Sequence, residues 1–321
     1  MAILAGIDEA GYGPILGPLV VSGVAVRVPD ERLGDPLWTT LRETITSKVT
    51  RSTGRRLAVA DSKKLFRGRN NLAPLERAAL VMLAAAGRHP KTWRGLLRIL
   101  APNVARQFSI YPWYAESDFS LPLSRGVGEV ELQANAVRRD CNQSGVELMG
   151  MFCEPLLAGA FNRLVSNTRN KAVVLMGLAL RIVDRIMRLA PNERVRVCID
   201  RLGGRQHYRD VLMTTLPDYS LQIMEESAER SAYRLTKSSR ICEVEFAVKS
   251  EERHFCVALA SVYSKYLREV FMHAFNEYWA GHLKNVRPTA GYYTDAKRWL
   301  ADACDAIEHA GIDRSILVRS R

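Results

Sequence analysis

The residues of this chain that could carry chemistry are four acids at or beside the ends of predicted strands. They are Asp8, Glu9, Asp200 and Glu251. Carboxylates are costly to bury beside a sheet, and several that converge would repel one another unless a cation lay between them. Mg²⁺ or Mn²⁺ suits an all-oxygen ligand set, and two such ions about 4 Å apart can catalyse phosphodiester hydrolysis. The four acids are therefore candidate metal ligands and catalytic residues.

The glycine-rich stretch after the first two acids bears on whether they can share a site. Adjacent residues of a strand point to opposite faces, so Asp8 and Glu9 can meet one ion only if the strand kinks or ends there. Gly11, Gly13 and Pro14 make such a kink plausible, although Glu9 could also be a simple strand-end acid. A dinucleotide-binding loop is disfavoured, because the run is GYGPILG and its proline stands where a helix should start.

The elements that would position these acids alternate between strand and helix. Valine-rich or apolar strands are predicted at 2–8, 19–28, 146–155, 194–200, 219–227 and 241–248. Helices are predicted at 75–87, 93–101, 156–164, 172–189, 256–279 and 291–311. The first two strands flank a Gly/Pro turn and form an antiparallel hairpin. The pattern predicts an α/β layer fold with a mixed sheet.

Charge points to a polyanionic partner. The formal net charge is +12, and the stretch 48–69 holds eight basic residues against the single acid Asp61. Nucleic acid or an anionic surface would suit this excess, although a charged run can also be a solvated loop.

Several classes of protein are disfavoured by composition. The acids at positions 8 and 9 do not fit a secretory signal, and the most apolar stretch, 172–187, is interrupted by three charges. The six cysteines show no CxxC spacing and sit mostly in apolar runs, so we expect free thiols in a reducing cytoplasm and no membrane association.

Five sequence blocks, in order, resemble the type 2 ribonuclease H family (ribonuclease HII). They are IDEAGYGPILGPLVV (7–21), DSKKL (61–65), RVCIDRLGG (196–204), ALASVYSKYLRE (258–269) and GYYT (291–294). The resemblance implies a ribonuclease H-like fold, a mixed five-stranded sheet flanked by helices. It also implies cleavage of the RNA strand of RNA/DNA hybrids, or of single ribonucleotides in duplex DNA, with Mg²⁺ or Mn²⁺ as cofactor.

The resemblance assigns roles to particular residues. The first three family acids match Asp8, Glu9 and Asp200, and the fourth falls at Glu251, where the family has aspartate. Glu245 and Glu252 are alternative fourth ligands. The implied substrate-binding residues are Gly11, Tyr12, Gly13, Lys63, Lys265 and Tyr292. Tyr12 departs from the family, which has arginine or lysine between the two glycines.

The stretch between Asp61 and Asp200 is longer than the resemblance implies. We therefore predict a catalytic domain at 1–87 and 146–315, and a helical or irregular insertion of unknown role at 88–145. The aromatic residues of the insertion could stack on bases or form a small local core.

The sequence leaves three functions open. The first is a metal-dependent endoribonuclease, acting as a monomer on RNA/DNA hybrid or ribonucleotide-containing DNA. The second is a catalytically weakened paralogue that binds hybrid or duplex nucleic acid. The third is a nuclease of the same fold that acts on structured DNA. His254 could assist proton transfer in the first case or simply lie at the surface.

Overall fold

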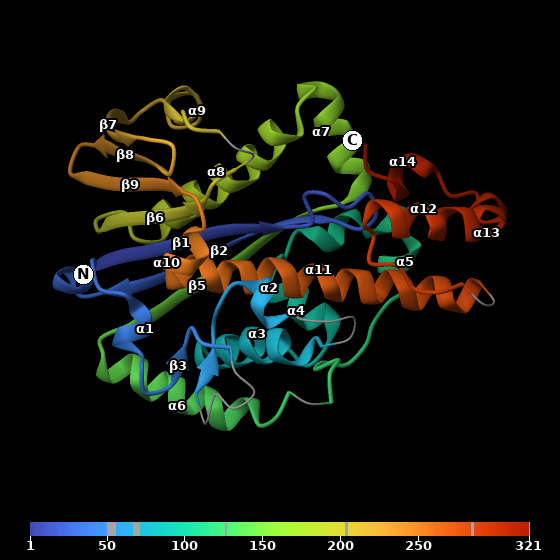
Figure 1. The fold of residues 1–321 in the computed structure, drawn as a ribbon, viewed down its shortest axis with the longest axis horizontal. Helices are drawn as coiled ribbons and strands as arrows, with labels where there is room; N and C mark the ends of the chain where they lie inside the picture. Colours follow the sequence, from blue (N-terminus) through green and yellow to red (C-terminus); the bar gives the residue numbers. More distant parts are fainter. Residues whose placement is uncertain (50–55, 67–70, 126, 203–204, 284–285, 321) are drawn as a thin grey trace.

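The computed structural model describes residues 1–49, 56–66, 71–125, 127–202, 205–283 and 286–320, and a seven-stranded mixed sheet is its central layer (Figure 1). The strand order is β5-β2-β1-β6-β9-β8-β7. The strands are β1 (Ala2–Ala10), β2 (Leu19–Val28), β5 (Glu147–Leu156), β6 (Arg194–Asp200), β7 (Ser220–Glu226), β8 (Arg230–Lys237) and β9 (Arg240–Ala247). β1, β6 and β9 run parallel, and the other neighbouring pairs are antiparallel. A separate parallel pair joins β3 (Ile45–Thr46) and β4 (Leu57–Ala58).

The mixed α/β class is confirmed, but the prediction of five strands is wrong. β7 and β8 extend the five strands β5-β2-β1-β6-β9 at one edge. β8 had no strand signal in its sequence, RSAYRLTK, which carries three basic residues and no apolar run. Its extended conformation comes from pairing with β7 on one side and β9 on the other, which the composition of the segment does not reveal.

The longer helices are mostly where periodicity predicted them. They are α3 (Ala73–Ala85), α4 (Trp93–Leu100), α6 (Val130–Gln143), α7 (Ala158–Thr168), α8 (Lys171–Leu189), α11 (Phe255–His282) and α12 (Tyr293–Asp302). The shorter ones are α1 (Leu37–Thr40), α2 (Ser62–Leu65), α5 (Pro112–Ala115), α9 (Arg209–Thr215), α10 (Ser250–Arg253), α13 (Cys304–His309) and α14 (Arg314–Leu317). Two 3₁₀ turns lie at Asp30–Arg32 and Val104–Ile110. None of the helices in the described residues is both long and apolar enough to cross a bilayer.

Helices α11 and α8 cover opposite faces of the sheet (Figure 1). Along β1, the side chains of Ala2 and Leu4 join the core under α11, whereas those of Ile3 and Ile7 join the core under α8. This is the two-residue alternation of a strand buried on both faces. Gly6 allows α11 to approach closely, because a Cβ there would lie 2.2 Å from the backbone carbon of Cys256.

The predicted insertion packs against α11. Trp93 lies 4.8 Å from Phe271 and Trp113 lies 5.8 Å from Phe275, as measured between ring centroids. Phe108, Tyr111, Trp113 and Tyr114 are each at most 3% exposed. These four aromatic side chains are therefore core residues, and the alternative that they stack on bases is wrong for them.

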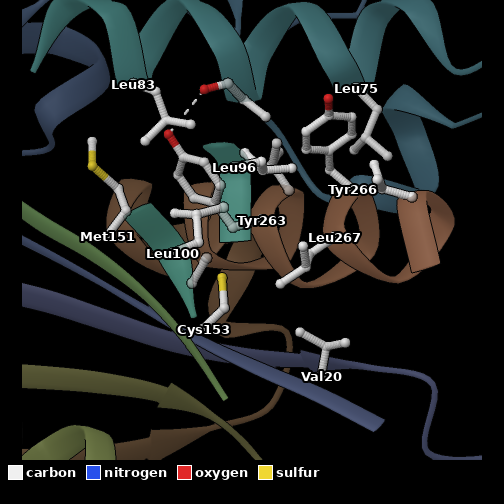
Figure 2. Packing of buried hydrophobic residues seen from close by; sticks show 14 of the residues in the cluster. Val20, Leu75, Leu83, Leu96, Leu100, Met151, Cys153, Tyr263, Tyr266 and Leu267 are labelled. Atoms are coloured by element: carbon white, nitrogen blue, oxygen red, sulfur yellow. Dashed lines mark hydrogen bonds between the residues drawn. The ribbon is translucent and has the colours of Figure 1, made fainter. Parts of the chain in front are cut away.

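Buried side chains from α3, α4 and α11 pack together in this core (Figure 2). Tyr263 and Tyr266 point from α11 toward α3, and the Tyr263 hydroxyl donates to the carbonyl of Ala79 at 3.0 Å. The Tyr266 hydroxyl donates to Glu76 at 2.9 Å. The fully buried Glu76 also accepts the backbone N–H groups of residues 123 and 124, so one carboxylate joins the segment 88–145 to α3 and α11.

Candidate active site

The carboxyl ends of the two central parallel strands bring the first and third predicted acids together. β1 and β6 pair in register up to Ile7 opposite Ile199, so Asp8 and Asp200 are the next residues on neighbouring strands. Adjacent strands lie about 4.8 Å apart. Residues 192 positions apart in the sequence thus meet at one edge of the sheet.

The fourth predicted acid reaches this edge through the turn after β9. Lys249 adopts the left-handed conformation, with φ of 54°, and reverses the chain into α10. The backbone N–H of Ser250 then donates to Asp200 Oδ1 at 3.0 Å. This bond fixes the first turn of α10, and Glu251 is its second residue.

Two serines on α11 fix the other side of the site. The Ser264 hydroxyl donates to the backbone carbonyl of Asp8 at 2.8 Å. Ser261, one helical turn earlier, accepts the backbone N–H of Ser62 at 3.0 Å and so holds α2 against α11. Both hydroxyls are buried, and together they position the first acid and the lysine that follows Ser62.

The pKa values of three of the acids show that the carboxylates are crowded. Burial raises the pKa of Asp8 well above its ordinary range, and repulsion from Glu9 and Asp200 raises it further. Burial and the Asp200 charge raise the pKa of Glu9 to about 7. The same two causes raise the pKa of Glu251 to about 7. The backbone alternation at Asp8 and Glu9 therefore does not keep their charges apart.

Lys63 on α2 is a basic side chain whose charge interacts with this group of acids. Desolvation lowers the pKa of Lys63, but attraction to Asp61, Asp8 and Glu251 outweighs it and leaves the pKa raised. Asp61 was not predicted as a site residue. It is 9% exposed, accepts the backbone N–H of Lys63 at 3.0 Å, and contributes to the raised pKa of Glu251. Its signal in the sequence was its place as the only acid in a basic stretch.

The donor set fits a hard divalent cation. One carboxylate oxygen of Glu9 and one of Glu251 are buried without a hydrogen-bond partner among the described residues. Buried carboxylate oxygens with raised pKa values and no donor would be stabilised by a cation that takes oxygen ligands. Asp8, Glu9, Asp200 and Glu251 could together hold Mg²⁺ or Mn²⁺.

A tighter cluster of potential ligands lies nearby but is already neutralised. In the described part of the chain, Cys198, Glu245 and His254 are the only trio whose ligand atoms all lie within 4.8 Å of one another. No three of the four predicted acids, all of them described, meet that spacing, so three of them could bind one ion only after side-chain rotation. Glu245 is paired with Arg230 at 2.9 Å and with Arg196 at 3.2 Å.

Ion pairs make Glu245 and Glu252 poor alternatives for the fourth metal ligand. Although burial raises the pKa of Glu245, hydrogen bonds from His254 and Arg230 hold it well below its usual range. A metal ion there would face two guanidinium groups, which disfavours it. Glu252 is paired with Lys64 at 2.9 Å. His254 is partly buried, with its Nε2 3.3 Å from a Glu245 oxygen.

The glycine-rich loop and the late Gly-Tyr turn lie side by side. The backbone N–H groups of Ile15 and Leu16 both donate to the carbonyl of Gly291, at 2.9 and 3.2 Å. Tyr292 is 50% exposed, and the Arg268 guanidinium lies 5.5 Å from its ring centroid. The Lys171 ammonium lies over the ring of Tyr12, 4.8 Å from its centroid.

Of the other residues predicted to bind substrate, Lys265 already has partners within the protein, and part of the basic stretch lies outside the described residues. Lys265 is paired with Glu269 at 2.6 Å and lies over the ring of Phe66 at 4.6 Å, so the structure gives it a protein partner. Part of the predicted basic stretch (residues 51, 55, 67 and 69) and the glycines at 203–204 lie outside the described residues. The structure thus brings four predicted acids and Lys63 into one group, with the loop at 11–13 directly after it in the chain.

Among known proteins, this chain is only remotely similar to several solved structures. No family model and no curated protein matches the chain. The chain resembles RNase HII from Archaeoglobus fulgidus, solved in a complex with PCNA, with 18% identity and a TM-score of 0.45 over 99% of this chain and 94% of that one. It also resembles ribonuclease H2 from Pyrococcus horikoshii, with 14% identity and a TM-score of 0.39 over 98% and 92%.

A third similar structure is Bst-RNase HIII in complex with Mn²⁺. Identity is 16% and the TM-score is 0.39, over 99% of this chain and 66% of that one. Likeness at these values does not assign an activity, so the function of this chain has to be inferred from its own site.

Proposed function

We propose that the protein is a divalent-metal-dependent endonuclease of the ribonuclease H type. Its substrate would be the RNA strand of RNA/DNA hybrids or single ribonucleotides in duplex DNA, and its products would carry 5′-phosphate and 3′-hydroxyl ends. The observation that carries the proposal is the convergence of Asp8, Glu9 and Asp200, at the ends of two parallel strands, with Glu251 on α10. Burial and repulsion from neighbouring carboxylates raise the pKa values of Asp8, Glu9 and Glu251.

The four acids would hold Mg²⁺ or Mn²⁺. When bound, such ions polarise the scissile phosphate and make water a better nucleophile at neutral pH. The protein's own part is to hold the carboxylates in place. Ser264 and Ser250 fix the backbones of β1 and α10, and the positive charge of Lys63 favours the ionised form of Glu9.

The surroundings of the acids suit a nucleic-acid strand. The loop at 11–13 has two glycines, so its backbone can approach a ribose 2′-hydroxyl closely. Tyr292 is half exposed and available to stack on a base or sugar. The net charge of +12 favours a polyanionic substrate, and the six free cysteines suit a reducing compartment such as the cytoplasm. We propose that the protein acts there as a monomer.

Cleavage of three labelled duplexes tests this function. One contains a single ribonucleotide, one is a full RNA/DNA hybrid, and one is an all-DNA junction, each incubated with Mg²⁺ or Mn²⁺. We expect cutting at ribonucleotides, and Asp8→Asn should reduce the rate by roughly 10³-fold or more, which corresponds to about 4 kcal/mol of transition-state stabilisation. Glu252→Gln is the matched control, because Glu252 pairs with Lys64 instead of joining the acid group. Near-normal cleavage by Asp8→Asn would refute the site.

A second candidate function is supported by the spacing of the acids. Because no three of them lie within 4.8 Å of one another, and glutamate stands at 251, the chain could bind hybrid or duplex without efficient cleavage. Binding of the single-ribonucleotide duplex and the full hybrid without cleavage would favour this function. Cutting of the junction alone would instead favour a nuclease for structured DNA.

A further inference from the structure

The segment after α13 returns to the glycine-rich loop and inserts an arginine beneath it. Asn162 on α7 clamps this segment by donating to the carbonyls of Ser315 and Val318, each at 2.7 Å. The backbone N–H of Arg319 then donates to the carbonyl of Ile15 at 2.8 Å. Arg319 is 3% exposed, and its guanidinium lies 4.7 Å from the ring centroid of Phe161.

The guanidinium of Arg319 is held by backbone carbonyls of the loop. Its Nη2 donates to the carbonyl of Gly11 at 2.6 Å, to that of Pro14, and more weakly to that of Tyr12 at 3.4 Å. Arg319 forms no ion pair with a carboxylate of the described residues, and its Nε and Nη1 are buried without a partner. Burying an unpaired cation is costly, so its hydrogen bonds to the loop must offset a penalty that an apolar residue would avoid.

These bonds fix the direction of the loop's N–H groups. In a trans peptide, the carbonyl of one residue and the N–H of the next lie in one plane and point in opposite directions. The carbonyls of Gly11 and Tyr12 point toward Arg319, so the N–H groups of Tyr12 and Gly13 point away from it. A Cβ at Gly13 would have no atom within 4 Å, so this part of the loop is open.

We propose that Arg319 is a positioning residue of the candidate active site, which orients the Tyr12 and Gly13 N–H groups toward an oxygen of the substrate strand. This inference rests on the proposed function for its substrate. Arg319 does not touch the acids in any interaction that we observe, so it acts through the loop and leaves ion binding unchanged.

The test compares Arg319→Met with Arg314→Met in the full chain. Methionine is a flexible aliphatic side chain that removes every side-chain donor, and Arg314 is an exposed arginine of the same segment. Three quantities are measured: amide hydrogen exchange of Ile15 and Leu16, kcat/KM on the single-ribonucleotide duplex, and the shift in melting temperature on adding Mn²⁺. Arg319→Lys serves as the conservative variant.

We expect Arg319→Met to speed exchange at Ile15 and Leu16 by about tenfold or more, the effect of losing charge-assisted hydrogen bonds. We expect kcat/KM to fall by a similar factor, the Mn²⁺ shift to stay at the wild-type value, and Arg319→Lys to be intermediate. Arg314→Met should match wild type in all three.

Unchanged exchange in Arg319→Met would overturn the proposal, as would a loss of the Mn²⁺ shift in parallel with activity. Failure of the proposed function can be told apart from failure of the positioning role. If the wild-type protein cuts none of the duplexes, the exchange result still decides whether Arg319 positions the loop. If the wild-type protein cuts and Arg319→Met cuts equally well, the positioning role is refuted and the nuclease stands.

Discussion

Replacing Glu9 by glutamine should stabilise the metal-free protein at alkaline pH. The folded-state pKa of Glu9 is about 7, against an ordinary value of 4.5, because burial and Asp200 oppose its ionisation. A raised carboxyl pKa contributes stability below about pH 4.5, and this stability is lost as pH rises through about 7. That difference in pKa corresponds to roughly 3 kcal/mol. We therefore expect Glu9→Gln to exceed wild type by roughly 2–3 kcal/mol at pH 8 in chelator.

A divalent cation should largely remove this difference. An ion present at 100 times its Kd stabilises the folded state by about 2.7 kcal/mol. Wild type should gain most of this from Mn²⁺ at pH 8, whereas Glu9→Gln should gain less because it has lost a charged ligand. At pH 5, where Glu9 is protonated in the fold and largely ionised only after unfolding, the two proteins should differ little.

The assay is urea denaturation at pH 5 and pH 8, in chelator and in Mn²⁺. Glu252→Gln is the control, because Glu252 is neutralised by Lys64 at 2.9 Å and its removal should change stability by no more than about 0.5 kcal/mol. If Glu9→Gln is no more stable than wild type at pH 8 without metal, the acids do not repel one another as we infer. If Mn²⁺ stabilises both proteins equally, Glu9 is not a ligand.

Three further predictions concern the loop, the core and the nucleic-acid surface. Gly11→Ala should lower the free energy of unfolding, measured by urea denaturation, by roughly 2 kcal/mol or more, because Gly11 has φ of +87° and a Cβ there would lie 2.6 Å from a backbone oxygen. Gly13→Ala should lower it by less than about 1 kcal/mol. Equal losses in the two variants would contradict the loop geometry. Glu76→Ala should cost roughly 3 kcal/mol in the same assay, because it leaves three donors unpaired in the core, and a cost below about 1 kcal/mol would argue against that network. Lys63→Ala should reduce the salt slope of hybrid binding by about 1, whereas Lys64→Ala should not, and identical slopes would remove Lys63 from the phosphate contacts.

The strand-end acids could be predicted because their signal is local. An aspartate that ends an apolar run is visible in seven or eight residues, and the carboxyl ends of parallel strands share one edge of a sheet. The pairing of Asp8 with Asp200 follows once β1 and β6 are assigned as neighbours. The same argument could not choose among the acids near Glu251, since the choice depends on which of them arginines neutralise. Arg196 and Arg230 belong to other strands, and their register with Glu245 is a tertiary fact.

Other parts of the site had no local signal at all. Arg319 lies 308 residues after Gly11, and nothing in its own sequence environment distinguishes it from other basic residues. Asp61 was visible in a motif, but its effect on Glu251 depends on how α2 packs. β8 became a strand because two neighbours pair with it, and its composition carries little β preference. In each case the determining interaction joins segments far apart in the chain.

The scaffold explains how a group of mutually repelling carboxylates can be held together. Two of the acids are anchored by hydrogen bonds, from the Ser264 hydroxyl to the Asp8 carbonyl and from the Ser250 N–H to Asp200, so their placement does not rely on attraction between the acidic side chains. The close approach of α11 at Gly6 supplies the rigid surface from which Ser264 acts. If the four acids hold a cation as we propose, a site built this way carries a stability cost without metal that the cation would offset. The same uncompensated charge that weakens the metal-free fold at pH 8 would then be the source of the affinity for a divalent ion.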